Sequence, residues 1–463
     1  MERAVKPGHP GALVLGSIFC VPFILYGMGI LTVPLFIGAL LLALFLLLLL
    51  INFEMGFLII ILMRSSLDYL KNFTDFNLAA LVSVALIVLG VFYVLFRKVD
   101  IFQYEDSPVF LIFLGMTAVS VFYSPDLSES LSDWLRLLSV FSVYLLARIL
   151  FEKASQVKSA FIAIFLSALL PVTVATIQLI TGQGLVLDGD QARIVGTFLH
   201  PNAFASYLLI LLVIGTSQWL ERDHLVAPAL LRPLVAAIFV IFILTFSRGG
   251  WLAFIVSMLF LGAIRYRRLL ILLPILLLIV VVAVPSTLDR IHNIFDVGYT
   301  HGRSAWDWRQ DTWREILPLF YQKPLLGHGL ATVEIEFGIL AHNDYLRLLA
   351  ETGILGFLAY LLLMLNLMAV TWRDFRKTRS ELARGLQIGL IAMTVGFLCR
   401  EFADNTLRNT VVMIYFWLLV ALVRNMSRLA ARAPASEWTI PTEPETGPDP
   451  GDPRNGLPGG RFS

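Results

Sequence analysis

Apolar runs follow one another along almost the whole chain, and this succession constrains the fold more than any other feature of the sequence. A hydrocarbon core about 30 Å thick takes roughly 20 helical residues to cross, and lipid offers the backbone no hydrogen-bond partners. Because several runs are short, we predict an all-α polytopic membrane protein with about 12, and between 12 and 14, transmembrane helices. The runs are Gly11–Leu31, Val33–Ile51, Phe57–Met63, Asn77–Phe96, Val109–Tyr123, Leu135–Phe151, Ala160–Ile180, Ala203–Leu220, Leu231–Phe246, Trp251–Ile264, Leu269–Val284, Leu346–Val370, Ile388–Leu398 and Val411–Val423.

Composition supports the membrane class and excludes others. With 58% hydrophobic residues and a mean hydropathy of +0.81, a chain of 463 residues has more apolar surface than one water-soluble core can bury. The formal charge of +2 leaves no basic excess to neutralise phosphates, so we expect no nucleic-acid partner. Cys20 and Cys399 both lie in apolar segments, which argues against a disulfide framework or a thiolate metal site.

The placement of positive charge predicts the orientation in the membrane. Basic residues recur at alternate connections, and such connections are typically cytoplasmic. Both termini are then cytoplasmic, although Arg64 and Lys71 depart slightly from the pattern. The basic connections are Arg97-Lys98, Lys153 with Lys158, Arg222, Arg265 with Arg267-Arg268, Trp372–Lys377, and Arg424 with Arg428 and Arg432. The external connections are Ser124–Asp133, Thr181–Asn202, Phe246–Gly250, Pro285–Tyr345 and Arg400–Asn409.

The sequence divides into four regions. Residues 1–284 are predicted to form transmembrane helices with short loops and no cleavable signal peptide. Residues 285–345 form a long periplasmic loop that contains short helices. Residues 346–430 return to transmembrane helices. The last region, 431–463, is rich in Pro, Gly and acidic residues, which is typical of a disordered cytoplasmic tail.

The long external loop is aromatic and basic. From Trp306 to Leu319 its pattern predicts an amphipathic helix at the membrane interface, anchored by Trp and Leu with arginines on the polar side. This helix carries Arg309 and Trp313, and Arg303 precedes it. An alternative for each arginine is a simple contact with lipid headgroups.

The loop ends in a histidine at the start of an apolar run. His342 is followed by Asn343 and Asp344, so an imidazole, an amide and a carboxylate stand together where the apolar run begins. One interpretation is that His342 caps the helix or lies as a hydrated interfacial residue. The shorter external loop holds Arg193, which taken alone could be an interfacial residue that snorkels to water.

Together these groups suggest a chemistry. Guanidinium groups bind phosphate bidentately and stay charged, so two arginines suit a pyrophosphate that is held and then released as a leaving group. A histidine suits the removal of a proton from an attacking hydroxyl. Arg193, Arg309 and His342 therefore predict a group-transfer site for a lipid-linked pyrophosphate. Asp188 and Asp190 form the only close acidic pair on this face, and a solvated turn explains them, so we predict no metal and no cofactor.

Three stretches stand in a fixed order on the predicted outer face. They are Arg193 through Gly196 to Pro201-Asn202, then Ser247-Arg248 before a helix, then Arg309 and Trp313 through Pro324, Gly327 and Gly329 to His342-Asn343 and Glu351-Thr352-Gly353. In this order they resemble the O-antigen ligase and polymerase superfamily of bacterial polysaccharide assembly. The resemblance covers roughly the second half of the chain.

The resemblance implies a GT-C-type glycosyltransferase of the Gram-negative inner membrane with a periplasmic active site. Its donor would be a polysaccharide on undecaprenyl pyrophosphate, and its acceptor, for a ligase, a sugar hydroxyl of lipid A-core. Arg193 and Arg309 would hold the pyrophosphate, and His342 would be the base of a metal-independent inverting transfer that completes lipopolysaccharide. Asn343, Arg248, Arg303 and Trp313 would support the site, although Arg248 suits a structural ion pair equally well.

Two alternatives stay open. An O-antigen polymerase would use the same stretches to extend undecaprenyl-pyrophosphate-linked repeat units, and we favour a ligase because a basic and aromatic loop suits a phosphorylated core. A transporter of lipid-linked oligosaccharide would hold the pyrophosphate without breaking a bond. Transporters usually place charges near the bilayer midplane between repeated halves, and we find no internal repeat.

Overall fold

The structure is a computed structural model that describes residues 28, 52–69, 78–188, 191–283 and 305–432. The chain is mostly helical, as expected of an all-α polytopic membrane protein. Apart from Met28 and residues 431–432, the first two predicted apolar runs and the predicted C-terminal tail lie outside the described residues, and so does Arg303.

The helices follow the apolar runs of the sequence. In the first part of the chain they are α3 (Phe53–Leu67), α4 (Leu78–Phe96), η2 (Ile101–Gln103), α5 (Ser107–Val121), α6 (Leu127–Leu150), α7 (Ala154–Leu166) and α8 (Leu169–Thr181). A two-stranded antiparallel hairpin follows, β1 (Val186–Asp188) with β2 (Gln191–Arg193). Then come α9 (Pro201–Trp219), α10 (Pro228–Leu244), α11 (Arg248–Ile264), α12 (Leu269–Ala283), α14 (Ala305–Gln322), α15 (Thr332–Phe337), α16 (Asp344–Lys377), α17 (Glu381–Glu401), η3 (Thr406–Arg408) and α18 (Thr410–Ala430).

Six helical segments in the described part of the chain are long and apolar enough to cross a membrane. One of them, Ala154–Thr181, joins α7 and α8. Four shorter apolar helices, α5, α10, α11 and α12, accompany them. The predicted number of 12 to 14 transmembrane helices stays a prediction.

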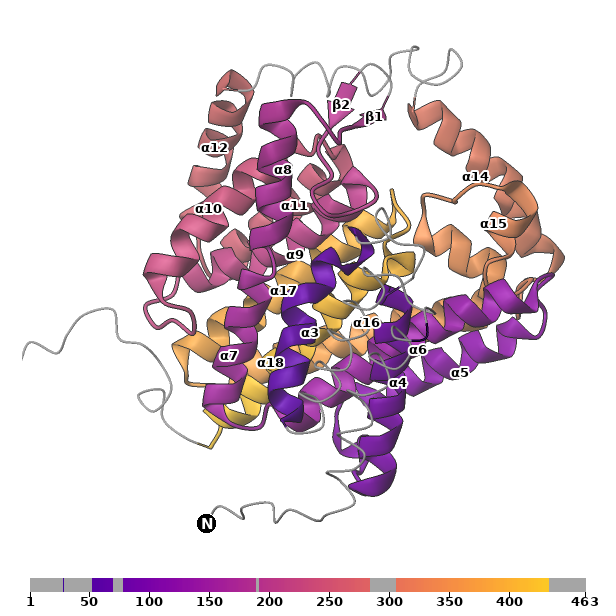
Figure 1. Ribbon diagram of the computed structural model, residues 1–463, viewed down its shortest axis with the longest axis horizontal. Helices are drawn as coiled ribbons and strands as arrows, with labels where there is room; N and C mark the ends of the chain where they lie inside the picture. The colour runs from indigo at the N-terminus through magenta and orange to yellow at the C-terminus, as the bar shows by residue number, and fades with distance from the viewer. Residues whose placement is uncertain (1–27, 29–51, 70–77, 189–190, 284–304, 433–463) are drawn as a thin grey trace, which may run out of the picture.

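The centre of the bundle is formed by α9, α17 and α18. The spanning window of α18 is 89% buried and that of α4 only 22%, so α18 is an internal helix and α4 a peripheral one. Helix α17 packs against α9 and α11, and α18 packs against α6. Figure 1 shows α17 and α18 in the middle, α10 and α12 towards one side, and α14 and α15 at the other.

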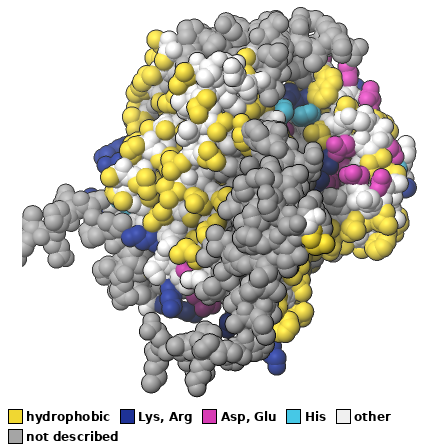
Figure 2. Space-filling view, in the orientation of Figure 1, with side chains coloured by type: hydrophobic (Ala, Val, Ile, Leu, Met, Phe, Trp, Pro, Cys, Tyr) yellow, Lys and Arg dark blue, Asp and Glu magenta, His cyan; other side chains and the backbone are white. Residues whose placement is uncertain are grey.

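The outer surface differs between these two sides. Hydrophobic side chains cover much of the face over α8, α10 and α12, whereas acidic side chains gather where α14 and α15 lie (Figure 2). Exposed apolar side chains of α10 and α12 include Val240, Ile271 and Leu278. A broad apolar surface of this kind suits contact with lipid.

Helix α6 begins earlier than the sequence predicted. The side chain of Asp126 accepts hydrogen bonds from the backbone N–H groups of Ser128 (2.8 Å) and Glu129 (3.1 Å). With this N-cap the helix starts at Leu127, so most of the predicted loop Ser124–Asp133 is helical.

The longest helix, α16, is interrupted at Gly353, where φ is +65° and ψ is −171°. The chain around the break pairs with the segment 324–329. Ile354 N–H donates to the Pro324 carbonyl (2.8 Å), and Gly329 N–H donates to the Glu351 carbonyl (2.9 Å). A Cβ atom at Gly353 would lie 2.3 Å from the Leu325 oxygen, so only glycine fits this approach.

Candidate functional site

His342 lies directly before α16 in an unusual backbone conformation. Its φ of +46° is uncommon for a residue with a side chain. Ala341 before it is fully buried, and the side chain of Asn343 after it accepts the Leu346 N–H (3.0 Å) as the N-cap of α16. The imidazole itself is 21% exposed. His342 is therefore anchored on both sides while its ring stays accessible, and it is Asn343, not His342, that caps the helix.

The imidazole faces a carboxylate that sequence reasoning did not single out. His342 Nδ1 lies 3.6 Å from Oδ1 of Asp404, in the connection after α17. Asp404 Oδ1 also accepts the Asn405 N–H (3.0 Å), and its Oδ2 accepts Nη2 of Arg400 (2.6 Å). Catalytic hydrogen bonds are often long before substrate binds, so 3.6 Å is within reach of a productive contact.

The charge of Asp404 is set by its neighbours. Burial raises the pKa of its carboxyl, but the Arg400 guanidinium and the imidazole of His342 outweigh this effect and hold that pKa well below its ordinary value. Asp404 is therefore an anion at neutral pH, directed at Nδ1 of His342.

A chain of hydrogen bonds leads from Asp404 to the shorter external loop. Arg400 is 2% exposed and donates from Nε to Ser206 Oγ (3.1 Å) and from Nη2 to the Asn202 carbonyl (3.3 Å). The side chain of Asn202 accepts Nη2 of Arg193 (3.0 Å). It also accepts the hydroxyl of Ser247 (3.0 Å). The Pro-Asn and Ser-Arg motifs of the sequence thus meet at Asn202.

Gly249 shows how closely α11 approaches this chain. A Cβ atom there would lie 2.4 Å from Nη1 of Arg400. The guanidinium therefore lies against the first turn of α11, and α9, α11 and α17 enclose it together.

Arg193 is held deep in the loop that leads into α9. Its side chain is 3% exposed, and Nε donates to the Thr245 carbonyl (2.8 Å). The loop itself is fixed by Gln178 of α8, whose side chain accepts the Gly196 N–H (2.9 Å) and donates to the Gly196 carbonyl (3.2 Å). The structure thus joins Arg193 to the Asn202 network, and its binding of pyrophosphate stays a prediction.

The predicted amphipathic helix is present as α14, but its tryptophans face the protein. Trp308 lies edge-on to the His342 ring, with centroids 5.3 Å apart. Trp313 donates from Nε1 to the Ala341 carbonyl (2.9 Å) and contacts Phe402. These tryptophans therefore hold the segment that carries His342, which corrects their predicted role as lipid anchors.

The remaining predicted residues lie around this centre. Arg309 follows Trp308 on α14 and is partly buried. Arg248 is the first residue of α11. The structure therefore brings Asp404 to His342 and links Arg193 to Asp404 through Asn202 and Arg400.

Arg400 and Asp404 were missed because they belong to none of the recognised motifs. One signal was available, since the sequence placed the Arg400–Asn409 connection on the outer face. Buried ionisable residues at helix ends in membrane proteins are typically functional. No group of three or more His, Cys, Asp or Glu side chains that could hold a metal ion occurs among the described residues.

A family model matches part of the chain. Residues 233–361 match the family model described as O-antigen ligase. The matched segment includes Arg248, Arg309 and His342, whereas Arg193 and Asp404 lie outside it. No curated protein matches the chain. The match over residues 233–361 supports membership of the chain in the O-antigen ligase and polymerase superfamily.

Proposed function

We propose that this protein is an O-antigen ligase of the Gram-negative inner membrane. It would transfer O-antigen polysaccharide from undecaprenyl pyrophosphate to a sugar hydroxyl of lipid A-core on the periplasmic side, and so complete lipopolysaccharide. The observation that carries the proposal is the accessible imidazole of His342 with its Nδ1 turned to the Asp404 carboxylate. Residues 233–361 match the O-antigen ligase model, and this pair supplies a base of the kind that the proposed transfer needs.

In the proposed mechanism, Asp404 fixes the tautomer of His342. A proton on Nδ1 that points to the carboxylate leaves Nε2 as the acceptor. Nε2 removes the proton from the acceptor hydroxyl while that oxygen attacks the anomeric carbon of the donor sugar. The bond from this carbon to the pyrophosphate oxygen breaks, and undecaprenyl pyrophosphate leaves with the electron pair. A single displacement of this kind inverts the anomeric carbon.

The leaving group gains negative charge as the bond breaks, and fixed positive charge would stabilise it. We assign this task to Arg309, on the helix whose Trp308 contacts His342, and to Arg193. Arg193 has a second task, because its bond to Asn202 supports the chain of contacts that ends at Asp404. Asp404 and Arg400 act through His342 and are positioning residues.

We favour the ligase over the polymerase because the long loop is aromatic and carries arginines, as suits a phosphorylated acceptor. The structure adds that Trp308 of α14 lies beside His342. The charge of α14 does not separate the two reactions, since Arg309 and Arg314 stand among Asp307, Asp311 and Glu315.

A reconstituted assay tests the proposal. Purified protein is mixed with undecaprenyl-pyrophosphate-linked O-polysaccharide and lipid A-core in the presence of a chelator. We expect high-mass lipopolysaccharide with the wild type, and a loss of about 1,000-fold in rate with His342→Ala, within the range for removal of a general base. Arg309→Ala should lower the rate by about 100-fold.

The control is Glu336→Gln, a substitution of an exposed carboxylate on α15 that should leave the rate unchanged. Lengthening of the lipid-linked donor without lipopolysaccharide would identify a polymerase instead. Movement of intact donor between leaflets, with neither product, would identify a transporter. Full activity of His342→Ala in folded protein would overturn the mechanism.

A further inference from the structure

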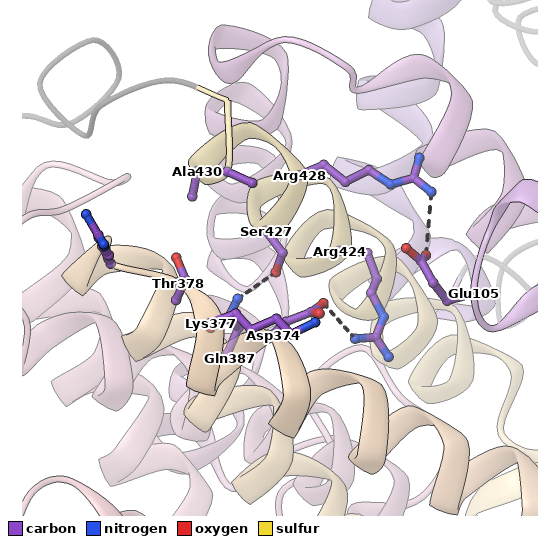
Figure 3. A pocket seen from close by; sticks show the side chains of 11 residues that line it. Glu105, Asp374, Lys377, Thr378, Gln387, Arg424, Ser427, Arg428 and Ala430 are labelled. Atoms are coloured by element: carbon purple, nitrogen blue, oxygen red, sulfur yellow. Dashed lines mark hydrogen bonds and ion pairs between the residues drawn. The ribbon is translucent and has the colours of Figure 1, made fainter.

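A cavity of about 450 Å³ lies at the end of the bundle remote from His342. Helix α16 begins beside His342, and its last residues line this cavity, so the two places are separated by the length of the helix. The walls come from the end of α16, the connection to α17, the last turns of α18 and the segment before α5 (Figure 3). Its volume is within the roughly 300–1,000 Å³ typical of small-molecule sites.

Positive charge dominates the lining. Four cations, Lys377, Arg379, Arg424 and Arg428, face two carboxylates, Glu105 and Asp374. These cations come from α16, the connection after it and α18.

Both carboxylates are already paired. Glu105 lies 3.3 Å from Arg148 and 3.5 Å from Arg428. Burial raises the pKa of Glu105, but Arg148 and Arg428 outweigh this effect, so that pKa lies below its ordinary value and the group is ionised. The one charge of Glu105 is thus shared by two arginines.

The second carboxylate is shared in the same way. Asp374 lies 3.3 Å from Arg373 and 3.6 Å from Nη1 of Arg424. Arg424 is buried and also donates to both oxygens of Asp106 (2.9 and 3.0 Å). Arg424 is therefore held in place by Asp106 and Asp374 where it lines the cavity.

Two of the four lining cations are not paired with these carboxylates. Lys377 and Arg379 are exposed, and neither forms an ion pair with any residue that the structure describes. Between them in the chain, the hydroxyl of Thr378 is buried and has no hydrogen-bond partner there. On α17, Gln387 donates to Ser427 (2.8 Å), while its carbonyl oxygen is left without a donor among the described residues.

We propose that this cavity binds the phosphate group of an anionic ligand, a phosphate mono- or diester. Lys377, Arg379 and Arg428 line the cavity from the end of α16, the connection after it and α18, and several cations from different elements suit a group with several acceptor oxygens. The cavity exceeds the size of a phosphate group alone, so part of the ester lies inside it as well. Two sources share this chemistry, an anionic phospholipid headgroup and a soluble phosphate ester. Basic pockets between transmembrane helices are known to hold lipid headgroups.

Two binding measurements on the full-length protein separate the sources. In the first, the protein is placed in nanodiscs of phosphatidylcholine with a small fraction of phosphatidylglycerol, and retained phosphatidylglycerol is counted by native mass spectrometry. In the second, glycerol 3-phosphate and inorganic phosphate are titrated by calorimetry. We expect saturable binding in one of the two measurements. Lys377→Ala and Arg379→Ala should each weaken the binding affinity about tenfold, as for the loss of one charge-assisted contact.

The matched control is Arg376→Ala, which removes an exposed cation one residue before Lys377 that does not line the cavity. This variant should bind as the wild type does. Equal weakening by all three substitutions would mean general attraction to the basic surface and would overturn the site. Lack of saturable binding in both arms would overturn it too. Binding that appears only after deletion of residues 433–463, which carry five acidic and two basic side chains, would assign the cavity to that segment instead.

Discussion

The two ends of the helix pair α16 and α17 use charge in opposite ways. At the His342 end, Arg400 is buried and matched by Asp404, Ser206 and Asn202. At the other end, Lys377 and Arg379 line a cavity without a carboxylate partner in the described chain. A fully paired set of contacts fixes the positions of its side chains without a ligand, whereas an excess of positive charge favours binding of an anion. In the functions proposed here, the same helices carry a pre-arranged transfer site at one end and an anion-binding cavity at the other.

The largest effect that separates the two ends should come from Asp404→Asn. An amide removes the charge opposite His342 and no longer fixes its tautomer, so we expect turnover in the reconstituted assay to fall by about 100-fold. In the double variant with His342→Ala the two losses should not add, because Asp404 acts through His342.

The substitutions Lys377→Ala and Arg379→Ala test the other end in the same assay. Both should leave turnover unchanged at saturating substrate. A large fall would break the comparison, because it would couple the cavity to the transfer reaction.

The next test concerns the backbone that holds the His342 end of α16. Gly353→Ala should destabilise the protein by about 3 kcal/mol, since a positive φ costs about 1 kcal/mol and the new Cβ atom would meet the Leu325 carbonyl at 2.3 Å. Gly338→Ala is the matched control, with φ at +64° and no atom within 4 Å, and should cost only about 1 kcal/mol. Chemical denaturation in detergent measures both, and equal losses would contradict the close approach at Gly353.

A third, smaller effect is expected from Trp313→Phe. An aromatic ring remains, although it is smaller than the indole, and the donor to the Ala341 carbonyl is lost. This change should cost about 1 kcal/mol and slow turnover several-fold as His342 loosens. Trp372→Phe, at the opposite end of α16 and 38% exposed, should change stability by less than about 0.5 kcal/mol. Identical melting curves and rates for the two variants would argue against a positioning role for Trp313.

The smallest expected effect is a pH dependence of stability. The pKa of Asp404 is lowered in the folded protein, so its contribution is fully present above the ordinary value of about 3.9 and is lost as the pH falls through the lower folded value. The melting-temperature difference between wild type and Asp404→Asn should therefore be constant above about pH 5 and narrow below about pH 4. A difference that widens on acidification would contradict the assigned direction.

Much of the helical framework could be predicted from apolar runs, since spanning segments must be helical. The residues at which the helices begin and end could not be predicted. The cap at Asp126 starts α6 within a predicted loop, and the break at Gly353 depends on a backbone contact with residues 324–329. The small hairpin β1–β2 was not predicted either, because three-residue strands leave no periodic signal.

The site was predictable only in part. His342 could be selected because a histidine at a loop-to-helix junction is chemically distinctive and belongs to a motif. Its partner Asp404 lies 62 positions later in the chain, and their approach depends on how α16 and α17 pack. The direction of Trp308 and Trp313 likewise depends on tertiary contacts, because an amphipathic pattern does not say whether its apolar side meets lipid or protein.

The interruption of α16 also bears on how far His342 lies from the hydrocarbon core of the membrane. The part from Ile354 to Lys377 is roughly 36 Å long at 1.5 Å per residue, enough by itself to cross a hydrocarbon core of about 30 Å. The backbone around Gly353 is hydrogen-bonded to residues 324–329, so the break can lie at the lipid boundary without exposed polar groups. With the break at that boundary, His342 stands at most about 15 Å of helix above it, at the height of the headgroups. In the proposed reaction, a substrate anchored by its own lipid tail would then meet the imidazole without leaving the bilayer.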